Sequence, residues 1–359
     1  MPIRAIRSFG NGADISKLWP GTAVRLLDSG KAALALAIRH AVDSLPAGAG
    51  NRVALPAYGC PSLVAAALWA GVPPVFYDLA ADLSPEPGEL VNCLGDEDTV
   101  VVHVDAFGMD HGVPDHPSLI RDLAQSFSPY QRHWRPSAFR TTISTSRAKP
   151  LSLNGGGALL TRADAIDVSS LSEAEIARPG LALHAALYGL SMRSTVLGVL
   201  SSIPQIDTGG ANFSPMTGVQ RMPERWAGAF AAAVGLARER FDAYLDETNS
   251  MLALAYDAGV CIPGRPSPLT NPLPLWRIPV LCQSPESAMR LASEGRHLGV
   301  SRLYSRALPV IMGETVETSV ERWPGAMWIA ERLITLPTHG RLSRRQRSEL
   351  GGLLSASMN

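Results

Sequence analysis

Residues 139–161 read FRTTISTSRAKPLSLNGGGALLT, and this stretch decides the fold that we expect. A β-prone run at 143–146 precedes Lys149, in a chain whose basic residues are mostly arginines. Pro150 disfavours helix at the lysine, and three glycines at 155–157 allow a tight turn before an apolar run. Such a frame can hold a desolvated amine that attacks a carbonyl. The alternative is a surface lysine before a hairpin, and this stretch by itself favours that alternative.

Length and composition predict a two-domain globular protein. The chain has 359 residues, of which 46% are hydrophobic and 18% charged, enough for a large core. Lysine plus arginine and aspartate plus glutamate both number 32. Without a net charge, no electrostatic field draws the chain to nucleic acid or to an anionic membrane. We therefore expect neither as a partner.

Cysteine spacing and the N-terminal residues favour a cytoplasmic protein. The four cysteines are far apart and form no CxxC pair, which argues against a zinc site and a disulfide framework; they are Cys60, Cys93, Cys261 and Cys282. The N-terminus lacks the apolar core of a signal peptide. The most apolar run, Leu181 to Ile203, contains His184 and Arg193, so we interpret it as buried helices instead of a membrane span.

Strands alternate with helices along the first half, which indicates a parallel sheet with helical crossovers. The expected strands are 52–56, 75–77, 99–104 and 118–121, and the expected helices are 62–70 and 89–93. The connection between 104 and 118 is too short for a helical crossover. Ligands bind beyond the carboxyl ends of such strands. The residues that matter most are therefore Tyr58 to Cys60, Phe107-Gly108, Asp122 to Gln125 and Ser144 to Lys149.

A helix is expected over 31–45, with Ser29 as its N-cap. The free backbone N–H groups at such a start can bind an anion, although every helix start offers them. Residues 1–28 are predicted to be an irregular arm with short elements.

The second half begins with an apolar helical region up to Pro204 and a loop at Asn212. A long helix over 224–249 should lead into a small α+β layer. Its expected strands are 275–281, 301–304 and 334–336, and its expected helices are 286–298, 325–332 and 343–353. We predict a large domain at 1–235, including the N-terminal arm, and a small domain at 236–359.

Taken together, these stretches resemble the DegT-type sugar aminotransferases, which have the aspartate aminotransferase-like fold (fold type I of pyridoxal-phosphate enzymes). The resemblance covers nearly the whole chain. The matching stretches are SGKAALALAI, LPAYGCPSLVAAALWAGVPPVFYDL, VVHVDAFG, RDLAQSF, ISTSRAKPLSLNGGGALLT, GVSRLYSRALP and WIAERLITLPTHGRLSRRQRSEL. It implies an α/β protein whose large domain has a mostly parallel mixed sheet flanked by helices, followed by a small α+β C-terminal domain.

The resemblance also implies a cofactor, pyridoxal 5'-phosphate, and a role for each site residue. Lys149 would be the Schiff-base lysine and Asp122 the partner of the pyridine nitrogen, where a carboxylate keeps that nitrogen protonated. Gln125 would lie near the ring's phenolic side, and Asn212 would reach the neighbouring subunit's phosphate. The full cofactor-binding set is Ser29, Gly30, Lys31, Cys60, Asp122, Gln125, Ser144, Lys149 and Asn212.

The expected function is transfer of an amino group from an amino acid, with glutamate as the expected donor, to a nucleotide-linked keto sugar. The family's setting implies a homodimer with sites at the subunit interface and a role in surface polysaccharide or glycosylated metabolites. Two alternatives stay open. One is a sugar dehydratase of the same fold, which carries histidine where Lys149 stands. The other is a non-catalytic sugar-nucleotide binding or regulatory protein.

The chain departs from the family pattern at four places. Gly59 and Cys60 stand where a threonine and a ring-stacking aromatic are usual, and Cys60 offers less stacking area. Arg121 replaces a glutamate, Lys31 replaces a threonine, and the connection before Asp122 lacks a helix. We interpret His103 as a hydrogen-bonded strand residue and leave Tyr304 as a candidate core residue.

Overall fold

The fold is described by a computed structural model. It describes residues 14–46, 51–131, 134, 136, 139–146, 149–162, 166–175, 212–264, 273–338 and 342–358. The apolar segment Leu181 to Ile203 lies outside the described residues.

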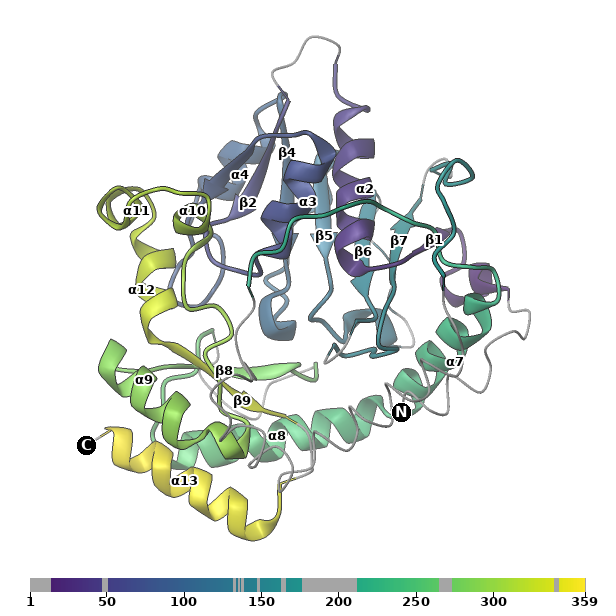
Figure 1. Ribbon diagram of the computed structural model, residues 1–359. Helices are drawn as coiled ribbons and strands as arrows, with labels where there is room; N and C mark the ends of the chain where they lie inside the picture. The colour runs from purple at the N-terminus through teal and green to yellow at the C-terminus, as the bar shows by residue number, and fades with distance from the viewer. Residues whose placement is uncertain are drawn as a thin grey trace.

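A seven-stranded mixed sheet forms the centre of the large domain (Figure 1). Its strands are β1 (Ala23–Leu27), β2 (Arg52–Pro56), β3 (Pro74–Tyr77), β4 (Thr99–Val104), β5 (Leu119–Asp122), β6 (Arg140–Ser144) and β7 (Gly157–Thr161), in the order β1-β7-β6-β5-β4-β2-β3. Strand β7 runs antiparallel to both its neighbours, whereas β3, β2, β4, β5 and β6 are parallel. The predicted mostly parallel mixed sheet is therefore confirmed.

Helices and short turns connect the strands. They are η1 (Ile15–Leu18), α2 (Gly30–Val42), α3 (Ser62–Ala70), α4 (Glu89–Leu94), η2 (Ala106–Gly108) and η3 (Ser128–Tyr130). Many of the buried residues of α2 and α3 are alanines, whose small side chains let the two helices pack closely together. The pair lies over one face of the sheet (Figure 1). Only the 3-10 turn η2 interrupts the β4–β5 connection, as its short length predicts. Strand β1, of five residues, is one of the short elements that we expected within residues 1–28.

The glycines of the deciding stretch have distinct roles. Gly156 has φ +86°, which glycine adopts without strain, and its amide donates to the carbonyl of Asp28 (2.8 Å). At Gly157 a Cβ would lie 2.5 Å from the backbone nitrogen of Gly30. The run therefore brings the start of β7 against the start of α2.

The expected single helix over 224–249 is two helices. Helix α7 (Trp226–Glu239) ends at Arg240, whose φ of −98° and ψ of 8° interrupt the helix before α8 (Phe241–Asp257). The pair runs along one side of the molecule from the sheet to the small domain (Figure 1). The predicted domain boundary at 235/236 falls inside α7 and stays a prediction.

The small domain has a two-stranded antiparallel sheet, β8 (Arg277–Leu281) with β9 (Leu333–Pro337). Its helices are α9 (Pro285–Glu294), η5 (Arg296–Leu298), α10 (Leu308–Ile311), α11 (Val316–Arg322), α12 (Pro324–Arg332) and α13 (Arg344–Met358). The predicted strand 301–304 is wrong. Only Ser301 pairs, in an isolated bridge with Thr335, because Arg302 turns to donate to the carbonyl of Ala330 at the end of α12 (2.9 Å).

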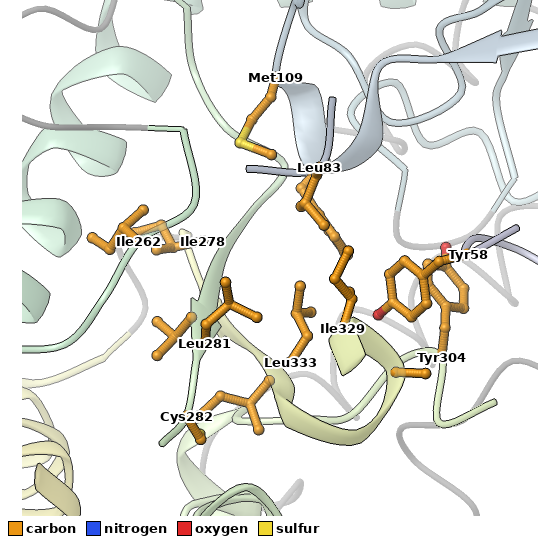
Figure 2. Packing of buried hydrophobic residues seen from close by; sticks show 14 of the residues in the cluster. Tyr58, Leu83, Met109, Ile262, Ile278, Leu281, Cys282, Tyr304, Ile329 and Leu333 are labelled. Carbon is orange, nitrogen blue, oxygen red and sulfur yellow. The ribbon is translucent and has the colours of Figure 1, made fainter. Parts of the chain in front are cut away.

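The two domains share one apolar core. Figure 2 shows Leu83 of the large domain pointing toward Ile329 of the small one, and Met109 and Leu333 belong to the same cluster. Buried Asp78, at the end of β3, accepts the N–H groups of Gly325 (2.8 Å) and Ala326 (2.7 Å) at the start of α12. These contacts hold the small domain against the carboxyl edge of the sheet. Among the described residues, no helix is long and apolar enough to cross a membrane.

Candidate active site

Asp122 lies at the carboxyl end of β5, and the residue is 9% exposed. Its Oδ1 accepts from the N–H of Ala124 (3.0 Å) and from the hydroxyl of Thr142 on β6 (3.1 Å). Within the described part of the chain both bonds end on the same oxygen, which leaves Oδ2 for a further donor. Burial raises the pKa of this carboxyl, and the two donors and the charge of Lys149 act in the opposite direction. A cationic N–H donor placed at Oδ2 would offset the cost of burying the charge.

Lys149 is half-buried and close enough to Asp122 for their charges to interact. Its Nζ lies 4.6 Å from the centroid of the Trp276 ring, which comes from the segment just before β8. Lys149 lies in the connection between the antiparallel strands β6 and β7 and is partly buried there, so its role in the site stays a prediction. The structure brings together the two residues that the sequence singled out as the lysine and carboxylate of one site.

The start of α2 lies directly against the end of β6. Ser29 is the N-cap, and its hydroxyl accepts from the N–H of Ala32 (3.0 Å). A Cβ on Gly30 would lie 2.5 Å from the Cβ of Ser144, so only glycine allows this approach. The Oγ of Ser144 accepts from the N–H of Ser146 (3.3 Å). Hydroxyls and first-turn N–H groups thus converge at a helix N-terminus, which suits a phosphate.

Gln125 is buried, and both ends of its amide bond to the protein. Oε1 accepts from the N–H of Phe107 (2.8 Å), and Nε2 donates to the hydroxyl of Tyr304 (2.7 Å). Phe107 adopts φ +57°, a left-handed conformation that is strained for a bulky side chain. The amide of Gln125 therefore joins a strained turn after β4 to a small-domain tyrosine. Its predicted place beside the cofactor ring stays a prediction.

Aromatic rings from four parts of the chain line this region. Phe107 stacks on Trp276 with 6.3 Å between centroids, and Tyr304 contacts both Phe107 (6.2 Å) and Tyr58 (5.8 Å). Figure 2 shows Tyr58 and Tyr304 side by side. The Cys60 thiol lies beside the Tyr304 hydroxyl, where it contributes with burial to raising that group's pKa. Tyr304, a candidate core residue from the sequence, is thus part of the site region.

Lys31 and Asn212 lie at the rim. The Nζ of Lys31 donates to the carbonyl of Ser214 (3.3 Å), so this side chain reaches toward the 212–214 loop. Asn212 is exposed, and within the described chain no hydrogen bond to its side chain is found. Its role at a neighbouring subunit stays a prediction.

Arg121, the residue before Asp122, forms a second charged cluster with Asp105 and Asp110. Arg121 donates to both carboxyl oxygens of buried Asp105 (3.3 Å each) and to Asp110 (3.1 Å). Burial raises the pKa of Asp105 to about 7, against the lowering effect of Arg121. Burial likewise lowers the pKa of His103 to about 3.

The prediction that His103 is hydrogen-bonded is wrong. Within the described chain neither ring nitrogen has a hydrogen-bond partner, and Nε2 lies 3.7 Å from Asp105 Oδ1. The ring is packed as a neutral group, because charging it in this buried place is unfavourable.

Sequence reasoning missed Trp276 and Thr142 and did not foresee how Phe107 and Tyr304 meet. The sequence did indicate that Phe107 lies near the site, because it follows β4 at the ligand-binding edge. It gave no such indication for Trp276, since the position of Trp276 in the chain says nothing of its distance from Lys149.

No protein-family model matches the chain, and no curated protein matches it significantly. Solved structures do. A DegT DnrJ EryC1 StrS aminotransferase from Brucella abortus has a TM-score of 0.63 and 17% identity over 98% of this chain and 94% of its own. The 3-amino-5-hydroxybenzoic acid synthase has a TM-score of 0.65 and 16% identity, over 99% and 90%. A Streptococcus pneumoniae protein described as a sugar aminotransferase, in its PMP form, has a TM-score of 0.61 and 16% identity, over 99% and 88%.

The fold is aspartate aminotransferase-like. The structural resemblance to DegT-type aminotransferases that we expected from the sequence is confirmed over nearly the whole chain.

Proposed function

We propose that this protein is a pyridoxal-phosphate-dependent aminotransferase that transfers an amino group from an amino acid to a keto sugar. One observation carries the proposal: a lysine and a buried carboxylate interact at the carboxyl edge of the sheet, beside the N-terminus of α2. This arrangement matches the chemistry of a cofactor with an aldehyde, a basic ring nitrogen and a phosphate.

The residues present fit that cofactor. The N–H groups at the start of α2 and the hydroxyl of Ser144 would hold the phosphate, in a cradle that a Cβ on Gly30 would fill. Oδ2 of Asp122 would accept from the ring nitrogen. When bound, the cofactor supplies the carbonyl that takes up the amino group and a ring that delocalises negative charge.

The protein's own groups then do three things. The amine of Lys149 would hold the cofactor and would accept and return a proton at its Nζ. The carboxylate of Asp122 would keep the ring nitrogen protonated. The aromatic residues Phe107, Trp276 and Tyr304 keep water from one side of the site.

For the acceptor we propose a nucleotide-linked keto sugar, and for the donor glutamate. The neighbour described as a sugar aminotransferase supports a sugar acceptor, and the sequence resemblance supports the nucleotide and the donor. A cytoplasmic location and a role in surface polysaccharide stay predictions.

Absorption and mass spectrometry test the proposal. Protein mixed with pyridoxal phosphate should gain a visible band, and borohydride should fix the cofactor on Lys149. The other lysines, Lys17 and Lys31, serve as internal controls in the same digest. In a separate sample without borohydride, adding glutamate should abolish the visible band. An unmodified Lys149 would refute the assignment.

Product analysis separates the alternatives. A deoxygenated sugar without amino transfer would identify a dehydratase. Binding of a nucleotide sugar without transfer from any donor would favour the non-catalytic protein, which the replacement of a ring-stacking aromatic by Cys60 suggests.

We also propose a homodimer in which Asn212 acts on the partner's site. Exposed Phe213, beside Asn212, supports a covered surface there. Mixing Lys149→Ala with Asn212→Ala subunits tests this. If Asn212 acts across the interface, one site of each mixed dimer contains both Lys149 and Asn212, and activity returns. If it acts within its own chain, no mixed site is complete. A stable monomer by light scattering that still binds the cofactor would end the idea.

A further inference from the structure

We propose that Trp276 is a positioning residue that holds the amine of Lys149 inside the site whenever the amine is not bonded to the cofactor. The purpose of this role depends on the proposed function, but the contact itself does not. The Nζ of Lys149 lies 4.6 Å from the centroid of the Trp276 ring. That is within the range in which a tryptophan face attracts an ammonium group.

The indole is held in place by its own backbone and by its neighbours. The N–H of Trp276 donates to the carbonyl of Phe107 (2.9 Å), and its carbonyl accepts from the hydroxyl of Thr338 (2.9 Å). Phe107 stacks on the ring with only 8° between planes. The ring therefore presents a fixed face, attached to the large domain through Phe107 and to the small domain through Thr338.

The glycine after Phe107 makes this attachment possible. Gly108 has φ +92°, and a Cβ there would lie 3.3 Å from both the nitrogen of Trp276 and the carbonyl oxygen of Pro274. The Trp276 segment thus packs directly on the turn after β4. Close backbone packing of this kind fixes the ring relative to the end of β5, where Asp122 lies.

Two attractions then act on one amine. The negative charge of Asp122 and the face of Trp276 both attract the ammonium group, at a place where the amine can return to the cofactor. The tryptophan comes from the segment just before β8, so the small domain supplies the ring face that the amine meets. The flexible lysine is thereby kept from extending into solvent.

Trace labelling of amines tests the proposal. Full-length protein, stripped of cofactor with hydroxylamine, is treated with a trace of acetic anhydride, and the acetylation of each lysine is measured by peptide mass spectrometry. Exposed Lys17 is the reference, and Lys31 is the control. Trp276→Leu should raise the Lys149-to-Lys17 ratio about twofold to fivefold, because the amine then loses the ring face that holds it away from the reagent. Trp276→Phe should give a smaller rise, and Trp328→Leu none.

Fluorinated tryptophan separates attraction from simple access. Fluorine weakens the negative face of the indole with little change of shape, so uniform incorporation should raise the Lys149 ratio in the wild-type chain. In Trp276→Leu it should have no effect. An unchanged ratio in Trp276→Leu, or a rise there without any effect of fluorination in the wild-type chain, would overturn the proposal. The fluorinated wild-type protein gives the answer even if Trp276→Leu does not fold.

Discussion

Two buried carboxylates lie one strand apart and have different surroundings. Asp105 follows β4, is fully buried and accepts from Arg121 with both oxygens. Asp122 ends β5 and, among the described residues, accepts only neutral donors and does so with one oxygen. The backbone joins them, because the N–H of Asp105 donates to the carbonyl of Asp122 (3.2 Å).

The contrast shows how partner type separates structure from function. A carboxylate that a guanidinium already pairs has little to offer a ligand, whereas one with a remaining oxygen and a nearby lysine can receive a cation. Changes in the Asp122 cluster should therefore affect catalysis, and changes in the Asp105 cluster should affect stability. The predictions below test this separation.

Lys149→Ala should have the largest effect and abolish amino transfer, lowering the rate by about 10⁴-fold or more, because it removes both a nucleophile and a proton carrier. The lysine is half-buried, so the unfolding free energy of the cofactor-free protein should change by less than about 1 kcal/mol. Single-turnover assays and urea unfolding measure the two effects. Turnover near the wild-type level would mean that the site is wrongly assigned.

Asp122→Asn should retain the cofactor but slow the proton-transfer step about 10²-fold to 10³-fold, since an amide cannot stabilise a protonated ring nitrogen. Asp105→Asn is the matched control: the same isosteric change, made one strand away. It should reduce the rate far less. Equal losses of rate in the two variants would contradict the separation of the clusters.

Arg121→Met should destabilise the protein by about 3 kcal/mol at pH 8, because it leaves the Asp105 charge buried without its partner. At pH 5 the loss should be smaller, since Asp105, with a pKa of about 7, is then protonated. Denaturant unfolding at both pH values measures this. A loss independent of pH would indicate that packing of the arginine stem, not its charge, stabilises this region.

The smallest effect concerns the slope of stability against pH. The pKa of Asp105 is raised from 3.8 to about 7. Between these values the folded state binds a proton that the unfolded state does not, so this contribution to the unfolding free energy falls as pH rises. The pKa of His103 is lowered from 6.5 to about 3, so its contribution rises with pH over that range. The two contributions oppose each other between about pH 4 and 6.5.

Asp105→Asn removes the falling contribution. The unfolding free energy of this variant should therefore rise with pH more steeply than that of the wild type, by on the order of 1 kcal/mol per pH unit. His103→Phe should shift the slope in the opposite direction. Parallel curves for all three proteins would show that neither group changes its proton affinity on folding.

Local patterns in the sequence determined the elements of the large domain. Strands β2 and β4 and helix α3 have the predicted bounds, because apolar runs of strand or helix length stand between turn residues there. The deciding stretch also indicated the site. Its lysine, the carboxylate of RDLAQSF and the serine-glycine start of α2 were each expected beyond the carboxyl ends of neighbouring strands.

Only the tertiary structure decided what surrounds those residues. Trp276 meets Lys149, and Tyr304 meets Gln125, across more than 120 residues of chain. Such contacts depend on the order of strands and on how the small domain packs against the sheet, and a periodic pattern encodes neither. The break at Arg240, the turn of Arg302 toward α12 and the unbonded ring of His103 have the same origin. Sequence periodicity specifies which faces are buried, whereas packing selects which buried groups touch.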